Sequence, residues 1–166
     1  MLCRIISYQF NEIADEDRID ENEAVSIADS FFSARGSCQT EFELESCDYN
    51  ECSEEYLVKY RHYVDGFKTD ETFDVWLDAA GNVFSYINYF KGRYNNLSIS
   101  PSDYAAAESI LDAELGNIYP TYEVEDEFVT INDAGVLCLV KIVSVTISTG
   151  NDNIVTLEEH SVPIEQ

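Results

Sequence analysis

Two histidines are the first candidates for catalysis in this 166-residue chain, because histidine transfers protons most readily near neutral pH. His62 alternates with Tyr60 and Val64 in a strand-like stretch, and His160 lies close to the C-terminal end. Neither histidine belongs to a recognisable acid–base or nucleophile–base signature. No cysteine has the sequence context of a catalytic nucleophile. We therefore predict that both histidines are ordinary strand residues.

Carboxylates are the second candidates, since the chain contains 33 aspartates and glutamates. Asp74 and Asp78 flank Trp76 on one face of a predicted strand, which suits a sugar, a cation or the acid pair of a hydrolase. The alternative, which we favour, is that these two aspartates form the solvated face of an amphipathic strand. A hydrolase that uses a carboxylate pair is therefore the third of our hypotheses.

Oxygen-rich stretches raise the question of a metal ion. Residues 15–17 and 151–153 carry acids and amides, but neither stretch has the glycine and distal glutamate of an EF-hand loop. The chain also lacks a zinc ligand set, a phosphate-binding glycine loop and a dinucleotide fingerprint. The sequence therefore predicts no metal site and no cofactor.

Five cysteines leave at least one thiol unpaired within the monomer, and they are Cys3, Cys38, Cys47, Cys52 and Cys138. Residues 48–51 resemble a four-residue hairpin loop, so Cys47 and Cys52 would face each other at a separation that a disulfide spans. The alternative is a pair of reduced cysteines at strand ends.

Aromatic residues are the stronger indication of function, since tyrosine and tryptophan favour protein interfaces. A sheet covered by one helix buries only one face, so some rings of the first half of the chain should be accessible. The predicted binding residues are Tyr56, Tyr60, Tyr63, Trp76, Tyr86 and Tyr89. The alternative is that a homodimer partner or the other half of the chain covers them.

The net charge of −24 is extreme, and residues 1–95 and 96–166 each carry half of it. Such a field opposes nucleic-acid phosphates and anionic membranes, and it favours cations or basic protein surfaces. Hydrophobic residues make up 45% of the chain, so the charge does not indicate disorder. A cytosolic nucleic-acid mimic that occupies a basic protein is therefore our second hypothesis.

Two helices must position these residues. Residues 21–35 follow a capping Asp20 and place Ala24, Ile27, Ala28, Phe31 and Ala34 on one face. Residues 101–115 follow a capping Ser100, with Tyr104, Ala107, Leu111 and Leu115 as the buried stripe. Gly36 and Gly116 are the predicted stops of the two helices.

Alternating patterns after each helix predict strands. In the first half they fall near residues 41–45, 56–64, 73–78 and 83–90, with a turn at residues 78–82. In the second half they fall near residues 121–131, 136–147 and 153–162. Residues 136–147 are apolar on both faces apart from Lys141, which indicates a central, fully covered strand.

The helix-then-strands order occurs twice, at a spacing of about eighty residues. EFELE (residues 41–45) matches TYEVE (121–125), and LVKY (57–60) returns as LVKI (139–142). The predicted fold is α+β, with two tandem helix-then-antiparallel-sheet units, two helices and seven to eight strands. The predicted domains are an N-terminal strand with an acidic connector (1–19), a first repeat (20–95) and a second repeat (96–166).

The first repeat resembles the PepSY-like family. The resemblance rests on EAVSIA (residues 23–28), EYLVKY (55–60), VDGFKT (64–69) and VWLDAAGNV (75–83). It is looser over the second repeat, whose third strand is not followed by a glycine turn. The resemblance implies a cystatin-like, helix-on-sheet fold in secreted bacterial proteins. It also implies a non-catalytic module that binds or restrains a protein partner, sometimes a peptidase.

Localisation depends on what precedes Met1. No apolar run approaches the ~20 residues of a membrane span, and residues 1–10 lack the features of a signal peptide. We expect an extracytoplasmic protein if a leader has been removed, and a cytoplasmic one otherwise. The first hypothesis is thus a non-catalytic binding or regulatory module that recognises a protein or peptide through the aromatic sheet face of the first repeat.

Overall fold

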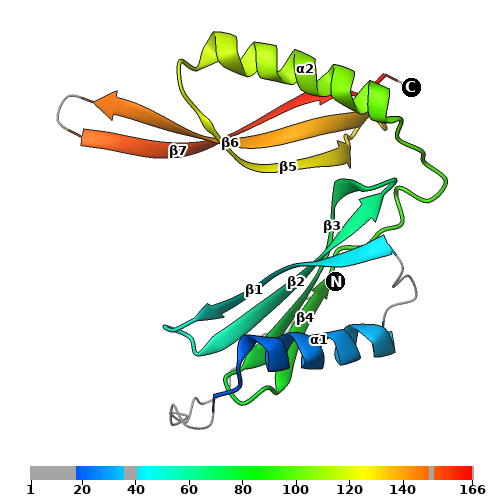
Figure 1. Ribbon diagram of the computed structural model, residues 1–166, viewed down its shortest axis with the longest axis vertical. Helices are drawn as coiled ribbons and strands as arrows, with labels where there is room; N and C mark the ends of the chain where they lie inside the picture. The colour runs from blue at the N-terminus through cyan, green and yellow to red at the C-terminus, as the bar shows by residue number, and fades with distance from the viewer. Residues whose placement is uncertain (1–17, 36–40, 150–151, 166) are drawn as a thin grey trace. The chain divides into compact units, whose positions relative to one another are not determined.

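The computed structural model describes residues 18–35, 41–149 and 152–165. In these ranges it has an α+β fold with two helices and seven strands in a mixed sheet (Figure 1). The elements are α1 (Glu21–Arg35), β1 (Phe42–Asn50), β2 (Glu55–Val64), β3 (Phe67–Asp78), β4 (Val83–Asn88), α2 (Pro101–Ile118), β5 (Glu123–Ile131), β6 (Leu137–Thr149) and β7 (Asp152–Pro163). The predictions for the N-terminal strand, Cys3, Gly36 and Cys38 lie outside the described residues.

Hydrogen bonding arranges the strands in the order β1-β2-β3-β5-β6-β7, and β4 also pairs with β3. Strands β3 and β5 run parallel at the pair Thr69–Val129. The sheet is therefore mixed, and the expectation of purely antiparallel pairing is wrong at this point. Strand β6 has a hydrogen-bonded neighbour on each side, which confirms the predicted central position. The prediction that residues 136–147 are fully covered is wrong at both ends, where Val136 and Ile147 are exposed.

The chain divides into two compact units, each of which we describe by itself. Of the described residues, unit 1 contains 18–35, 45–59 and 74–87. Unit 2 contains 41–44, 60–73, 88–149 and 152–165. Strands β1, β2 and β3 therefore contribute residues to both units.

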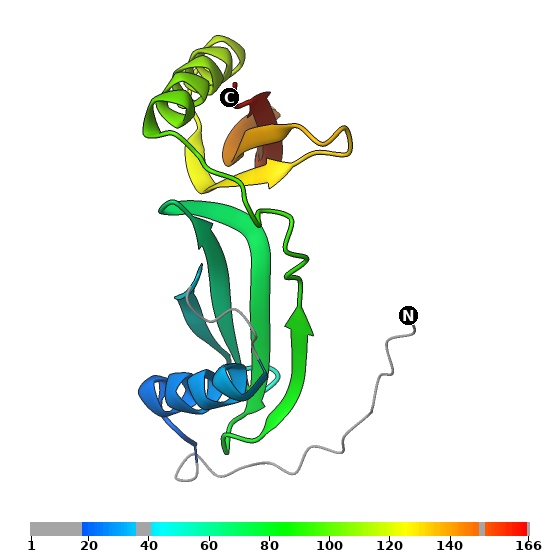
Figure 2. The same ribbon diagram turned by 90° about the vertical axis from the view of Figure 1, so that its right-hand side faces the viewer.

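Helix α1 begins where the sequence predicts. The Asp20 carboxylate accepts a hydrogen bond from the Glu23 backbone N–H at 2.8 Å, which is the expected N-cap. The helix lies along the sheet of unit 1 (Figures 1 and 2) and buries Ala24, Ala28 and Phe32. The predicted stripe is therefore wrong at its C-terminal end, because the four-residue step from Ala28 selects Phe32 instead of Phe31.

Helix α2 is longer than predicted. Ser100 caps it and Pro101 takes the first position, as expected, but the helix continues through Gly116 to Ile118. Gly116 has no positive φ, and a Cβ added there would meet nothing within 4 Å, so it is an ordinary helical residue. The C-cap is Tyr119, whose N–H donates to the Leu115 carbonyl.

The core of unit 2 lies between α2 and the strands β5, β6 and β7. Its buried residues are Tyr94, Ile99, Ala107, Leu111, Leu115, Val129, Leu137, Leu139, Val143, Val145, Val162 and Ile164. Odd-numbered residues of β6 supply most of its central side chains, as a strand with one face toward a helix requires.

Candidate functional site

The six aromatic residues predicted to bind a partner differ in exposure. Tyr56 and Tyr60 are buried, Tyr63 and Trp76 are half-buried, and Tyr86 and Tyr89 are exposed. Unit 1 contains Tyr56, Trp76 and Tyr86, and unit 2 contains the other three. The two buried tyrosines therefore offer no accessible ring, and Trp76 and Tyr86 are the accessible members in unit 1.

The turn between β1 and β2 shapes the surface near Trp76. It occupies residues 51–54, and the Asn50 side-chain oxygen accepts the Cys52 and Ser53 backbone N–H groups at 2.9 and 3.3 Å. The hairpin loop expected at residues 48–51 is therefore displaced along the chain. Cys47 lies within β1 and Cys52 lies in the turn, so they do not flank it, and both are free thiols. The predicted disulfide is absent for this reason.

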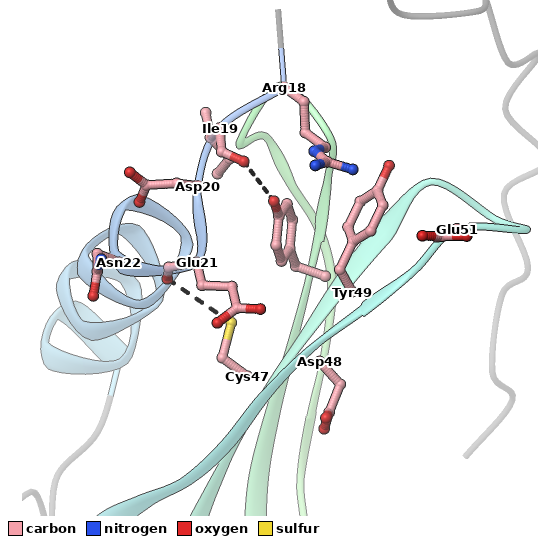
Figure 3. Close-up of a pocket in the computed structure, with 10 residues that line it drawn as sticks. Arg18, Ile19, Asp20, Glu21, Asn22, Cys47, Asp48, Tyr49 and Glu51 are labelled. Atoms are coloured by element: carbon pink, nitrogen blue, oxygen red, sulfur yellow. Dashed lines mark hydrogen bonds between the residues drawn. The ribbon is translucent and has the colours of Figure 1, made fainter. Parts of the chain in front are cut away.

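A first pocket of about 710 Å³ lies between the start of α1 and this turn (Figure 3). We call it the arginine pocket. Its lining residues are Arg18, Ile19, Asp20, Glu21, Asn22, Cys47, Asp48, Tyr49, Glu51 and Tyr56. The Arg18 guanidinium lies over the Tyr49 ring, 4.7 Å from its centroid, which is a cation–π contact. Tyr56 donates its hydroxyl to the Ile19 carbonyl, which ties the floor of the pocket to the entry of α1.

A second pocket of about 450 Å³ lies beside the first, and we call it the tryptophan pocket. Its lining residues are Asp48, Tyr49, Asn50, Glu51, Ser53, Glu55, Leu57 and Trp76. Leu57 and Trp76 supply apolar surface, and Asp48, Glu51 and Glu55 supply carboxylates. Tyr49 lines both pockets, so it forms a shared wall between them.

Acidic side chains predominate in the arginine pocket, which Asp20, Glu21, Asp48 and Glu51 line together with Arg18. Burial raises the pKa of the Cys47 thiol, and the carboxylates of Glu21 and Asp48 raise it further. The thiol is therefore protonated at neutral pH and is a poor nucleophile. An arrangement of carboxylates beside aromatic rings attracts a cationic side chain.

His62 in unit 2 is enclosed by oxygen atoms. Its Nδ1 lies 3.2 Å from the Thr69 hydroxyl oxygen, and its Nε2 lies 3.2 Å from a carboxylate oxygen of Glu41. The buried Glu71 places its Oε2 3.7 Å from Nδ1. Since His62 is only 1% exposed and both nitrogens face oxygen atoms, its ring is not open to a substrate.

A polar network in unit 2 supports the parallel contact between β3 and β5. The Asp70 carboxylate accepts hydrogen bonds from Arg93 at 2.5 Å, from the Thr130 hydroxyl at 2.9 Å and from the Tyr94 hydroxyl. Burial by itself raises the pKa of Asp70, but these three donors outweigh burial and hold the pKa below its ordinary value. The network therefore joins β3 to β5 next to Thr69–Val129, the residue pair at which the two strands pair through their backbones.

The carboxylate pair considered above does not form a hydrolase-like site. Asp78 holds the β3–β4 turn, accepting the Ala80 and Asn82 backbone N–H groups at 3.1 and 2.8 Å. Asp74 is buried, so our prediction of a solvated face is wrong for this residue. Alternation places Asp74 on the face opposite to Phe73 and Val75, but it does not determine whether that face is covered at a given residue.

The described part of the chain has no cluster of three or more histidines, cysteines or acids arranged to hold a metal ion. Within the same ranges, neither helix combines the length and apolar character needed to cross a bilayer.

The sequence alone did not identify Arg18, Tyr49 and Glu55 as site residues. Arg18 and Tyr49 are far apart in the chain, so no local pattern connects them. Strand alternation did indicate that Leu57 and Trp76 lie away from the core. Each is next in sequence to a core residue, Val58 and Leu77, and neighbouring residues of a strand point to opposite faces.

Comparisons with known proteins do not assign a function. No protein-family model matches the chain, and no curated protein is significantly similar to it.

Proposed function

We propose that this protein is a non-catalytic binding module that recognises a basic segment of a protein or peptide partner through unit 1. The tryptophan pocket would take a cationic side chain of that segment. One observation carries the proposal: the arginine pocket already holds a guanidinium, that of Arg18, over the Tyr49 ring. A partner's arginine or lysine would be recognised by the same chemistry in the neighbouring tryptophan pocket.

The chemistry of the two pockets favours a cation over other ligands. An aromatic face attracts a cation by about 0.5–2 kcal/mol, depending on how far the cation is desolvated. Asp48, Glu51 and Glu55 add charge attraction at the tryptophan pocket. The net charge of −24 increases the rate of encounter with a basic surface at low ionic strength.

The wider setting of the module is also a proposal. We propose that the chain consists of two tandem PepSY-like repeats that act outside the cytoplasm, with a peptidase as one class of partner. The order of helix followed by strands in each half supports this reading. It would fail if the cellular protein were retained in the cytoplasm.

The experiment uses Trp76, the single tryptophan, as an intrinsic probe. A hexapeptide of alternating glycine and arginine should quench or shift its fluorescence, and the matched glycine–glutamate peptide should not. Tyr49→Ala should weaken binding of the arginine peptide about 3- to 30-fold, the range set by a cation–π contact. The matched control is Phe84→Ala, which removes an exposed ring in unit 1 that lines neither pocket, and it should change affinity less than about twofold. Equal losses for both variants would contradict the proposal.

A second candidate is the acidic nucleic-acid mimic, favoured by the net charge of −24. A mimic binds through its general field, so its affinity for a basic DNA-binding protein would fall steeply with salt and would not respond to Tyr49→Ala. The two candidates therefore predict opposite results for the same variant.

A further inference from the structure

Strand β7 is the terminal strand of the sheet in the part of the chain that the structure describes. It pairs with β6 over twelve consecutive residue pairs, from Cys138–Pro163 to Thr149–Asp152, without a bulge. No other described strand pairs with it. An edge of this kind presents unpaired backbone groups to solvent.

Apolar side chains lie on both faces of β7 near the tip of the β6–β7 hairpin. Ile154 lies opposite Ile147, on the face that carries Val143 and Val145 toward α2. Val155 and Leu157 have the other parity and lie on the opposite face. Ile147, Ile154, Val155 and Leu157 are all exposed, and the paired strands β6 and β7 extend past the C-terminal end of α2 (Figure 1).

This pattern is unusual for an edge strand. Strands with apolar residues on both faces normally have neighbours along both edges. Edge strands normally carry lysine, proline or a bulge that prevents further pairing. Between residues 152 and 162, β7 has no lysine and no proline, and its register is uninterrupted. The edge is thus suited to pairing with another strand.

Charge selects the kind of strand that fits. Glu158 and Glu159 follow the apolar tract directly, and no lysine or arginine occurs from residue 142 to 166. The nearest base is Lys141, which is buried and bound by Asp112 at 2.6 Å and Glu127 at 3.0 Å. A second copy of the chain would bring the same acids and another net charge of −24, so self-pairing is opposed by repulsion.

We propose that the outer edge of β7 accepts an extended, basic segment of a partner protein as an added strand. Backbone hydrogen bonds supply the pairing, apolar side chains of the segment cover Ile154, Val155 and Leu157, and its lysines or arginines face the neighbouring glutamates. This surface lies in unit 2, so it is independent of the two pockets of unit 1.

The direct test is amide hydrogen exchange of the full chain with a nine-residue peptide of alternating lysine and valine. Strand addition should slow exchange of alternate backbone amides between residues 154 and 159, because the added strand accepts hydrogen bonds from the N–H groups that point away from β6. The same peptide with glutamate in place of lysine should give no protection. Protection confined to residues of unit 1, or no protection anywhere, would overturn the proposal.

A matched pair of variants tests the edge itself. Ile154 on β7 and Ile110 on α2 are both 53% exposed, so lysine at either position leaves the core untouched. Ile154→Lys should weaken peptide binding by at least about tenfold, because lysine is a natural blocker of edge pairing. Ile110→Lys should change binding less than about twofold, as expected for a remote surface substitution.

Sedimentation of the full chain without peptide tests whether a second copy of the chain, instead of a partner segment, binds the edge of β7. A concentration-dependent dimer that Ile154→Lys abolishes would show that a second copy occupies the edge and would overturn the proposal. A monomer that still binds the basic peptide supports it. The pocket variant Tyr49→Ala should leave β7 protection unchanged, which distinguishes this site from the pockets of unit 1.

Discussion

At the scale of single residues, Lys141 is the clearest case of a side chain whose role depends on its partners. It is 4% exposed on β6 and lies within 4 Å of carboxylate oxygens of Asp112, Glu127 and Glu108. Burial by itself lowers the pKa of Lys141, but the carboxylates of Asp112 and Glu127 outweigh burial and hold it above its ordinary value. Lys141 therefore stabilises three acids that would otherwise repel one another.

Lys141→Met should lower the free energy of unfolding at neutral pH by about 2 kcal/mol. This is below the ~3–5 kcal/mol typical of a broken buried pair, because the three carboxylates retain contact with water. The folded pKa is raised, so the contribution of Lys141 is fully present below the ordinary lysine pKa of about 10.4 and is lost as pH rises through the folded pKa. Urea unfolding between pH 7 and pH 11 should show a constant difference between wild type and variant up to about pH 10, and the difference should begin to narrow above it.

The control for this prediction is Lys141→Arg, which keeps the positive charge and should retain most of the stability at pH 7. If Lys141→Met is as stable as the wild-type protein at pH 7, the three carboxylates do not depend on Lys141.

At the scale of elements, two glycines that look alike in the sequence have different roles. Gly81 lies in the β3–β4 turn with φ of +85°, and a Cβ there would lie 2.8 Å from the Ile27 side chain. Gly116 lies inside α2, where a Cβ would meet nothing within 4 Å. The first glycine is required by the backbone and by the approach of α1, and the second is only tolerated.

Alanine at these two positions should act in opposite directions. Gly81→Ala should destabilise the protein by at least about 1 kcal/mol, since alanine is strained at positive φ and the new methyl group would displace Ile27. Gly116→Ala should stabilise α2 by about 0.5–1 kcal/mol, because alanine favours the helix interior. Thermal unfolding followed by circular dichroism measures both, and destabilisation by Gly116→Ala would show that Gly116 has a structural role.

Element bounds that rest on local interactions were predicted well. The start of α1 depends on Asp20 and the start of α2 on Ser100 and Pro101, all adjacent to the helices that they cap. The end of α2 and the β1–β2 turn were misplaced, because the local sequence allows either of two positions for each. The helix could end at Gly116 or at Ile118, and the turn could occupy residues 48–51 or 51–54. Asn50 decides the turn by accepting two backbone N–H groups, and Tyr119 ends α2 beyond the glycine.

At the scale of the whole molecule, the net charge of −24 is the dominant property. Only nine lysines and arginines balance 33 acids, and several of these bases are engaged internally: Arg93 with Asp70, Lys68 with Asp126 and Lys141 with Asp112. The excess acids repel one another in the folded state and destabilise it.

Added salt should therefore stabilise the fold. Raising NaCl from about 20 mM to about 500 mM shortens the Debye length from ~20 Å to ~4 Å and screens the repulsion between surface acids. The melting temperature should rise by several degrees, since ~1 kcal/mol corresponds to about 2–4 °C for a chain of this size. KCl should give the same rise, and a melting temperature that falls with both salts would mean that ion pairs outweigh the general repulsion.

The sequence by itself determined the α+β class, the two helices, a range of seven to eight strands, the central position of β6 and the acidic field. These follow from periodicity, caps and composition, which act between neighbouring residues or as a sum over the chain. Only the tertiary structure decided that β3 pairs in parallel with β5, that Tyr56 and Tyr60 are buried, and that Arg18 meets Tyr49. Each of these contacts joins residues distant in the chain, and local preferences carry no information about which distant partners meet.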